Sequence, residues 1–129
     1  KVASGGEMSR IMLALKNVIL SADIVESLVF DEVDTGIGGK TAEVVGRKLK
    51  TLAKNRQVLV ITHLPQIAAM SENHFTVQKE KTNERVLTVV KNLNRKEKIY
   101  EVARMLAGEK ITDISVQHAE EMVDLAEKG

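Results

Sequence analysis

Cysteine is absent from this 129-residue sequence, and aromatic residues make up only 2% of it. Without cysteine the chain can form neither a disulfide nor a thiolate metal site, which fits a reducing, cytosolic setting. With so few aromatic rings it lacks a stacking platform for single-stranded nucleic acid. The sequence therefore argues against disulfide-stabilised secreted proteins, zinc-thiolate modules and base-stacking domains.

Long apolar runs are also missing. The longest, such as IMLAL and VLVIT, fall far below the roughly 20 residues that a membrane span needs. Charge is balanced, with 19 basic and 18 acidic residues, so no overall field favours nucleic acid or an anionic membrane. We expect a soluble protein with no membrane partner. Residues 1–129 can hold one core, and a helix signal almost at the first residue suggests a segment of a larger domain.

Helical and strand-like patterns alternate along the chain, which predicts an α/β fold. The expected elements are a helix over 4–22, a strand over 28–32, a helix over 40–54, a strand over 57–62, a hairpin over 74–81 and 85–92 that turns at 82–84, a helix that stops at Gly108, and a helix from Thr112 onward. The two strands around the helix over 40–54 predict a parallel βαβ unit. Both strands are interpreted as buried, and the one over 57–62 is rich in β-branched residues and lacks alternation.

Apolar residues at helical spacing predict which face of each helix is buried. The expected buried positions are Met8, Ile11, Met12, Leu15 and Ile19 in the first helix, Ala42, Val45, Leu49 and Leu52 in the second, and Ile114, Met122 and Leu125 in the last. His118 lies on that last stripe, and His74 begins a strand with no partner at metal-ligand spacing. Both histidines are therefore interpreted as structural.

The stretch GGKT, after an apolar strand, suggests a phosphate-binding loop. Such a loop needs G-x-x-x-x-G-K-[ST], because glycine amides must wrap the phosphates without a side chain in the way. Counting back from Gly39 and Lys40, the first glycine position is occupied by Asp34, whose charge would repel phosphate. Lys40 is therefore expected only to begin a helix.

Polar residues follow both predicted strands: Asp31 and Glu32 end the first, and Thr62 and His63 close the second. In a parallel α/β sheet, ligands bind at the carboxyl ends of the strands, so Asp31, Glu32 and His63 should converge. Two acids and an imidazole suit phosphoryl transfer: one acid holds Mg²⁺, the second orients or deprotonates water, and the imidazole donates to a phosphate. The alternative is that the acids only cap the following turn.

The segment SGGE at residues 4–7 opens the first helix. A capping box explains Ser4 and Glu7. It does not explain Gly5 and Gly6, because glycine costs up to about 1 kcal/mol in a helix interior. Bare amides at these positions would let a phosphate approach the positive end of the helix.

The order SGGEMSR, LVFDEVD and VLVITH resembles the second half of an ABC-type ATPase head, with its signature motif, Walker B, D-loop and switch histidine. The stretches DEVDTGIGG, ITHLPQIAAMSENHF and KIYEVARMLAGEKITDISVQHAEEM are similar to the RecN family of bacterial DNA double-strand-break repair ATPases, which are related to the SMC proteins. This resemblance covers essentially the whole chain and implies the C-terminal part of the head. ABC transporter subunits are less similar. They commonly have proline or alanine after the acid pair, where this chain has Val33, and an acid after the switch histidine, where it has Leu64.

The resemblance implies a role for each matching residue. Ser4, Gly5, Gly6 and Glu7 match the signature that contacts ATP on an opposing head, Asp31 matches the magnesium ligand, Glu32 the catalytic carboxylate, and His63 the switch histidine. The D-loop match spans 33–38 and adds Asp34 to the expected nucleotide-binding residues. Gly38 replaces the aspartate that usually ends this loop and usually makes a contact across the dimer.

The family's Walker A lysine loop and Q-loop are not in this chain. The resemblance therefore implies an ATP and Mg²⁺ site completed by an N-terminal half of the same head and by a second head, with DNA bound through the full-length protein in the bacterial cytoplasm, at the nucleoid. On its own the chain is expected to be inactive, and its residues Val58 to Ile61 are expected to have unpaired backbone and uncovered apolar surface. Two alternatives are a non-catalytic binding or regulatory module with the same fold and a transporter segment.

Basic residues outnumber acidic ones, seven to three, between Lys79 and Lys98. Such a surface could touch a DNA backbone. The alternative is a solvated hairpin whose charges serve only solubility.

Overall fold

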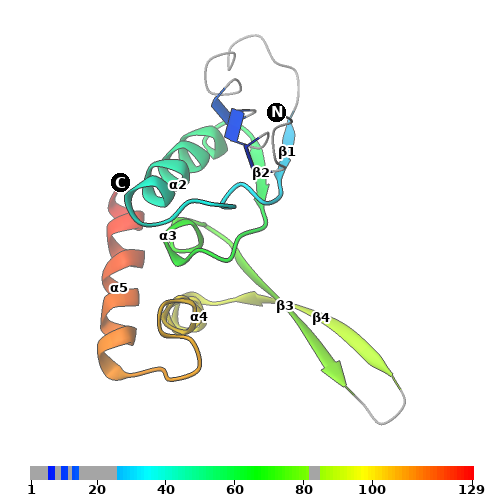
Figure 1. The fold of residues 1–129 in the computed structure, drawn as a ribbon, viewed down its shortest axis with the longest axis vertical. Helices are drawn as coiled ribbons and strands as arrows, with labels where there is room; N and C mark the ends of the chain where they lie inside the picture. The colour runs from blue at the N-terminus through cyan, green and yellow to red at the C-terminus, as the bar shows by residue number, and fades with distance from the viewer. Residues whose placement is uncertain (1–5, 8–9, 12, 15–25, 82–84) are drawn as a thin grey trace. The chain divides into compact units, whose positions relative to one another are not determined.

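The computed structural model describes residues 6–7, 10–11, 13–14, 26–81 and 85–129. The chain forms two compact units, Lys1–Met70 and Ser71–Gly129, which we call the first and second units (Figure 1). The elements are β1 (Ser27–Phe30), α2 (Gly39–Ala53), β2 (Gln57–Val60), α3 (Pro65–Ala68), β3 (His74–Lys81), β4 (Val86–Leu93), α4 (Arg95–Ala107) and α5 (Asp113–Lys128). The α/β class and the order of the described elements are confirmed, whereas α3 was not predicted. Most of the helix predicted over 4–22 lies outside the described residues.

The first unit is built on a parallel strand pair. β1 and β2 run in register from Ser27 opposite Gln57 to Phe30 opposite Val60, and α2 connects them. Just past the strands, the Ile61 amide donates to the Phe30 carbonyl over 2.9 Å. The predicted parallel βαβ unit is confirmed, and the chain leaves both strands at the same edge of the sheet.

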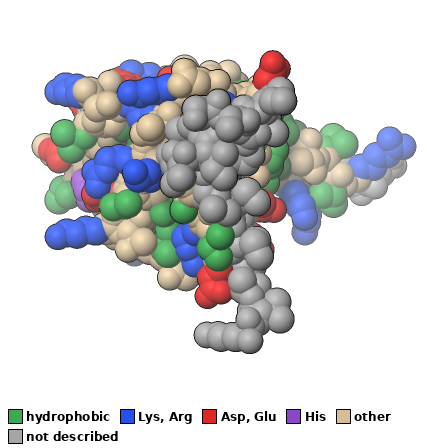
Figure 2. Space-filling model, turned by 90° about the horizontal axis from the view of Figure 1, so that it is seen from above, with side chains coloured by type: hydrophobic (Ala, Val, Ile, Leu, Met, Phe, Trp, Pro, Cys, Tyr) green, Lys and Arg blue, Asp and Glu red, His purple; other side chains and the backbone are tan. Residues whose placement is uncertain are grey.

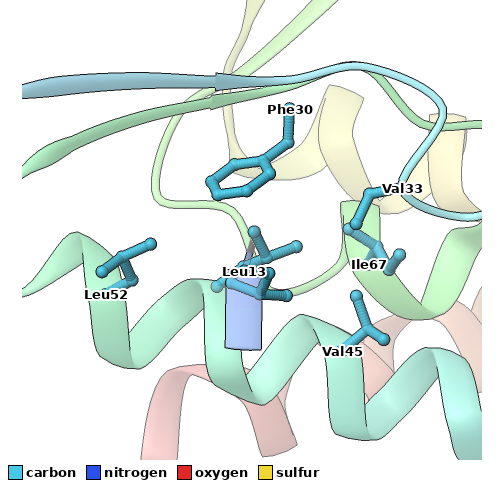
Figure 3. Packing of buried hydrophobic residues seen from close by; sticks show 7 residues of the cluster. Leu13, Phe30, Val33, Val45, Leu52 and Ile67 are labelled. Atoms are coloured by element: carbon cyan, nitrogen blue, oxygen red, sulfur yellow. The ribbon is translucent and has the colours of Figure 1, made fainter. Parts of the chain in front are cut away.

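The core of the first unit lies between this sheet and α2. Phe30, Val33, Leu52 and Ile67 point toward one another there (Figure 3). α2 buries Ala42, Val45, Gly46, Leu49 and Leu52, which includes every position predicted from its helical period. The first helix differs: Leu13 is buried in the core, whereas Ile11 is 50% exposed. The other predicted positions of that helix lie outside the described residues.

The prediction of strands buried on both faces is wrong. Val29, Leu59 and Ile61 are 66%, 53% and 55% exposed, while Leu28 and Val58 pack against the core. Side chains alternate across a strand, and α2 covers only one face of the pair. The unbroken apolar run alone gave no sign of this exposure, but the exposed Leu59 and Ile61 agree with the uncovered apolar surface expected over 58–61.

The second unit is an antiparallel ribbon followed by two packed helices. β3 and β4 pair from His74 opposite Leu93 to Lys81 opposite Val86, as the hairpin prediction requires. The turn predicted at 82–84 lies outside the described residues. α4 begins at a capping box formed by Asn94 and Glu97 and ends at Gly108, whose φ is 70°. Thr112 caps α5, so both helix boundaries read from the sequence are confirmed.

The predicted buried face of α5 is partly wrong. Ile114 and Leu125 are 80% and 70% exposed, whereas Ala119 and Val123 are fully buried. α4 likewise buries Val102 and Ala103 completely, so small and β-branched side chains form the packed faces of both helices. The large apolar residues of α5 had predicted a buried face that is rotated about the helix axis from the face that is buried in the structure. His118 is exposed.

No helix in the described part of the chain is both long enough and apolar enough to cross a membrane.

Candidate phosphoryl-transfer site

The bend after β1 exposes two carboxylates. Asp31 and Glu32 are both exposed, and the next residue, Val33, is fully buried. Glu32 has a φ of 56°, the left-handed region that side chains other than glycine, asparagine and aspartate seldom adopt. Backbone strain of this kind costs about 1–3 kcal/mol and persists where its surroundings hold it, often at functional sites. The Glu32 conformation marks this bend as a candidate site.

Asp34 lies in the same loop but faces inward, with 3% exposure. Its Oδ2 accepts hydrogen bonds from Thr62 Oγ1 at 2.5 Å and from the His63 amide at 2.8 Å. The His63 Nδ1 atom lies 3.0 Å from the same oxygen. Asp34 therefore fastens the loop after β1 to the end of β2.

The pKa of Asp34 is set by opposing effects. Burial raises this pKa. The hydrogen bonds from Thr62 and from the His63 amide, together with attraction to the His63 ring, lower it by more than burial raises it. The net direction is below the usual 3.8. Asp34 is thus a buried carboxylate that keeps its charge at neutral pH.

The first helix packs directly against the bend. A Cβ atom at Gly6 would lie 2.6 Å from the Glu32 carbonyl oxygen and 2.6 Å from Thr35 Cβ. Arg10 Nη1 donates to the Thr35 carbonyl at 2.6 Å and to the Val33 carbonyl at 3.3 Å. The close approach supplies a packing reason for glycine at position 6, and the predicted contact of this segment with phosphate stays a prediction.

The residues proposed from the sequence are placed as follows. Ser4 and Gly5 lie outside the described residues, Gly6 is buried and Glu7 is exposed. The strand ends meet as expected, but the carboxylate that contacts His63 is that of Asp34 rather than Asp31 or Glu32. Asp34 was expected to bind nucleotide, yet it is buried beneath His63. Lys40 is exposed in the first turn of α2, where it was expected.

Sequence reasoning placed Thr62 at the end of a strand without giving it a role, and it missed Arg10. Thr62 donates to Asp34, and its Oγ1 accepts from the Leu64 amide at 3.1 Å, which shapes the chain around His63. Arg10 supports the bend from the first helix. A role for Thr62 could have been proposed from its place at the end of a strand, but nothing in the pattern around Arg10 pointed to this loop.

The exposed acids fit a magnesium ion held together with a phosphate. Among the residues described, no group of three histidine or acidic side chains is arranged to hold a metal. Mg²⁺ does not need one, since it usually takes one or two carboxylates and completes its shell with water and substrate phosphates. An exposed Asp31 at the strand end suits that role, and Mg²⁺ would there neutralise phosphate charge.

Several basic side chains between Lys79 and Lys98 are buried or ion-paired in the fold. Lys98 is buried with its Nζ 2.5 Å from the Ser71 carbonyl, and Lys91 pairs with Glu97 at 2.6 Å. Arg95 binds Asp124 and lies near two glutamates of α5. Lys79 and Lys81 remain exposed on the ribbon, where basic and hydrophobic side chains lie together (Figure 2). DNA contact by this ribbon stays a prediction.

His74 is half-buried at the start of β3, as a structural histidine would be. Burial lowers its pKa below the usual 6.5; the negative charge of Glu101 opposes this and the positive charge of Lys98 adds to it. Its Nδ1 has no hydrogen-bond partner among the described residues. No metal-ligand group forms around it in that part of the chain, and its interpretation as structural is kept.

Comparison with known proteins gives one consistent result. The chain is 48% identical to DNA repair protein RecN of Halalkalibacterium halodurans over 98% of its length, and 46% identical to that of Bacillus subtilis over 99%. It is 47% identical to RecN of Treponema pallidum over 95% of its length. No family model matches.

The resemblance to RecN read from the sequence is therefore confirmed over nearly the whole chain. The chain spans about 22% of the length of each of these relatives.

Proposed function

We propose that this chain is the C-terminal part of an ATPase head in a RecN-like DNA repair protein, and that it supplies the hydrolytic half of a composite ATP site. The observation that carries the proposal is the strand edge at which an exposed Glu32, in a left-handed backbone, stands beside the loop that holds His63. The RecN name of relatives at 46–48% identity supports the DNA repair role.

Each side chain has a distinct task in this site. Asp31 holds Mg²⁺ against the phosphates, directly or through water. Glu32 orients or deprotonates the attacking water, and an exposed carboxylate on a fixed backbone is suited to that task. His63 donates a hydrogen bond to the terminal phosphate, as its 75% exposed side chain allows.

The rest of the site comes from outside these residues. A lysine loop on the N-terminal half of the same head cradles the phosphates, and the signature segment at 4–7 contacts ATP held by a second head. By itself, the 129-residue chain should therefore bind MgATP no more tightly than weakly millimolar. Calorimetric titration tests this, and micromolar affinity would point to a complete phosphate loop at GGKT.

The decisive test is a pair of substitutions in the full-length protein. Glu32→Gln keeps the size of the side chain but removes its charge, so turnover should fall by about 10²- to 10⁴-fold while ATP still binds. Lys40→Ala is the matched comparison, because Lys40 is exposed in the first turn of α2 and should cost far less turnover. Both kcat and nucleotide affinity are measured under identical magnesium and DNA conditions.

The opposite pattern would overturn the proposal. If Lys40→Ala abolished nucleotide binding while Glu32→Gln stayed fully active, GGKT would be the phosphate site. A true phosphate-loop lysine stabilises charge in both the ground state and the transition state, so its removal would weaken binding as well as turnover.

A further inference from the structure

The Asp34 carboxylate is the least exposed charged group at the candidate site. The function proposed above assigns it no role. It is 97% buried, since its exposure is 3%. Burying a charged carboxylate is costly unless it is hydrogen-bonded, and here the Thr62 hydroxyl and the His63 amide donate to one oxygen, which His63 Nδ1 also approaches. A carboxylate so occupied is badly placed to bind a nucleotide itself.

We propose that Asp34 is a positioning residue that acts through His63, a role that rests on the function proposed above. The His63 amide and Nδ1 both meet Asp34 Oδ2, so one carboxylate fixes the backbone and the ring of the same residue. Because Nδ1 lies 3.0 Å from Asp34 Oδ2, Nε2 is the ring nitrogen that is left to meet a phosphate.

Thr62 completes this arrangement. It donates to Asp34 Oδ2 at 2.5 Å and accepts from the Leu64 amide at 3.1 Å, so it holds the chain on both sides of His63. The His63 side chain nevertheless remains 75% exposed. The site thus combines a buried anchor with an exposed ring, as expected when an imidazole must be presented to a ligand in one orientation.

The experiment is a double-mutant cycle in the full-length protein, with Asp34→Asn, His63→Ala and the two combined. In Asp34→Asn the new side-chain amide can still accept hydrogen bonds through its carbonyl oxygen but carries no charge, so the loop should keep its fold. Loss of the outer partner of a metal-ligating histidine costs about 10- to 100-fold in activity, and we expect kcat to fall by a similar factor in Asp34→Asn. Nucleotide affinity should change little.

The informative result is the combined variant. If Asp34 acts only through His63, adding Asp34→Asn to His63→Ala should lower kcat no further, because contacting residues that serve one task are not additive. A merely structural aspartate would add its loss in both backgrounds and would lower the melting temperature in both. Asp124→Asn, an ion-paired aspartate of α5 in the second unit, is the matched control and should leave kcat unchanged.

The outcomes separate this inference from the proposed function. Full activity of His63→Ala would overturn the assigned role of His63. Loss of activity in His63→Ala with full activity in Asp34→Asn would leave the proposed function standing and overturn the role of Asp34. Additive losses would also overturn it, since they would show that Asp34 works independently of His63.

Discussion

Gly6 and Gly46 are both helical glycines, but their surroundings differ in a way that predicts opposite tolerance to alanine. A Cβ at Gly6 would meet the Glu32 carbonyl oxygen and Thr35 Cβ, each at 2.6 Å, and the backbone atom can yield only if the bend moves. A Cβ at Gly46 would meet Met70 Sδ at 2.7 Å, near the flexible end of a side chain. The first collision is rigid and the second can be relieved.

Gly6→Ala should therefore lower the free energy of unfolding by about 1–3 kcal/mol, the usual cost of overpacking. Gly46→Ala is the control. Its gain in helix propensity, up to about 1 kcal/mol, offsets the movement of Met70. Urea unfolding of both variants and the parent chain measures the difference. Equal destabilisation by the two substitutions would show that the contact between the first helix and the bend is not rigid.

These single positions also show how far sequence reasoning reaches. Asp31, Glu32 and His63 could be proposed because each follows a strand, and parallel strands end at one edge. The inward turn of Asp34 could not be read, because its direction depends on hydrogen bonds to residues almost thirty positions away. Gly6 was explained from the sequence by the approach of a phosphate to the helix end, because the backbone that packs against it is distant in sequence.

The start of α4 is a local network that links three charged or polar side chains. Asn94 Oδ1 accepts from the Glu97 amide, and Glu97 Oε2 accepts from the Asn94 amide, both at 2.9 Å. The other carboxylate oxygen of Glu97 lies 2.6 Å from Lys91 Nζ. The hydrogen bond from Lys91, and then that from the Asn94 amide, hold the pKa of Glu97 below its usual 4.5.

This network should make the second unit sensitive to acid. Because the folded-state pKa of Glu97 is depressed, the unfolded chain binds the proton first. The stabilising contribution is complete above pH 4.5 and is lost as the pH falls through the folded-state pKa. Glu97→Gln should therefore destabilise the chain at neutral pH, and its difference from the parent should shrink in acid. Urea midpoints across this range provide the measurement.

Glu109→Gln is the control, since Glu109 is exposed in the turn after α4. It should leave the pH dependence unchanged. A difference between Glu97→Gln and the parent that stayed constant down to strongly acidic pH would contradict the assigned role of Glu97.

Element boundaries were easier to predict than element faces. Gly108 and Thr112 carry the local stop and start signals that the sequence showed, and α4 and α5 obey them. Which faces of β1 and β2 are exposed depends on the elements that cover the sheet. Which face of α5 is buried depends on the side chains of α4 that pack against it. Neither is a property of the segment itself. The short helix α3 has too few residues to show a period.

Over the chain as a whole, the first unit leaves an apolar sheet face in contact with solvent. Val29 and Leu59 are opposite each other in the strand register and share a face, on which Ile61 also lies. All three are more than half exposed. The described sheet has only two strands, so each has an edge without a partner strand. Open edges beside exposed apolar surface favour association with another chain.

We therefore expect the isolated 129-residue chain to self-associate through this face, with mass by light scattering rising as concentration increases. Leu59→Glu should shift the population toward monomer, because burying an unpaired carboxylate at such an interface is costly. Val44→Glu is the matched control: Val44 is 49% exposed, but it lies on α2 and not on the sheet, so association should persist. A parent chain that stayed monomeric at high concentration would contradict the prediction, and equal dissociation by both variants would place the contact elsewhere.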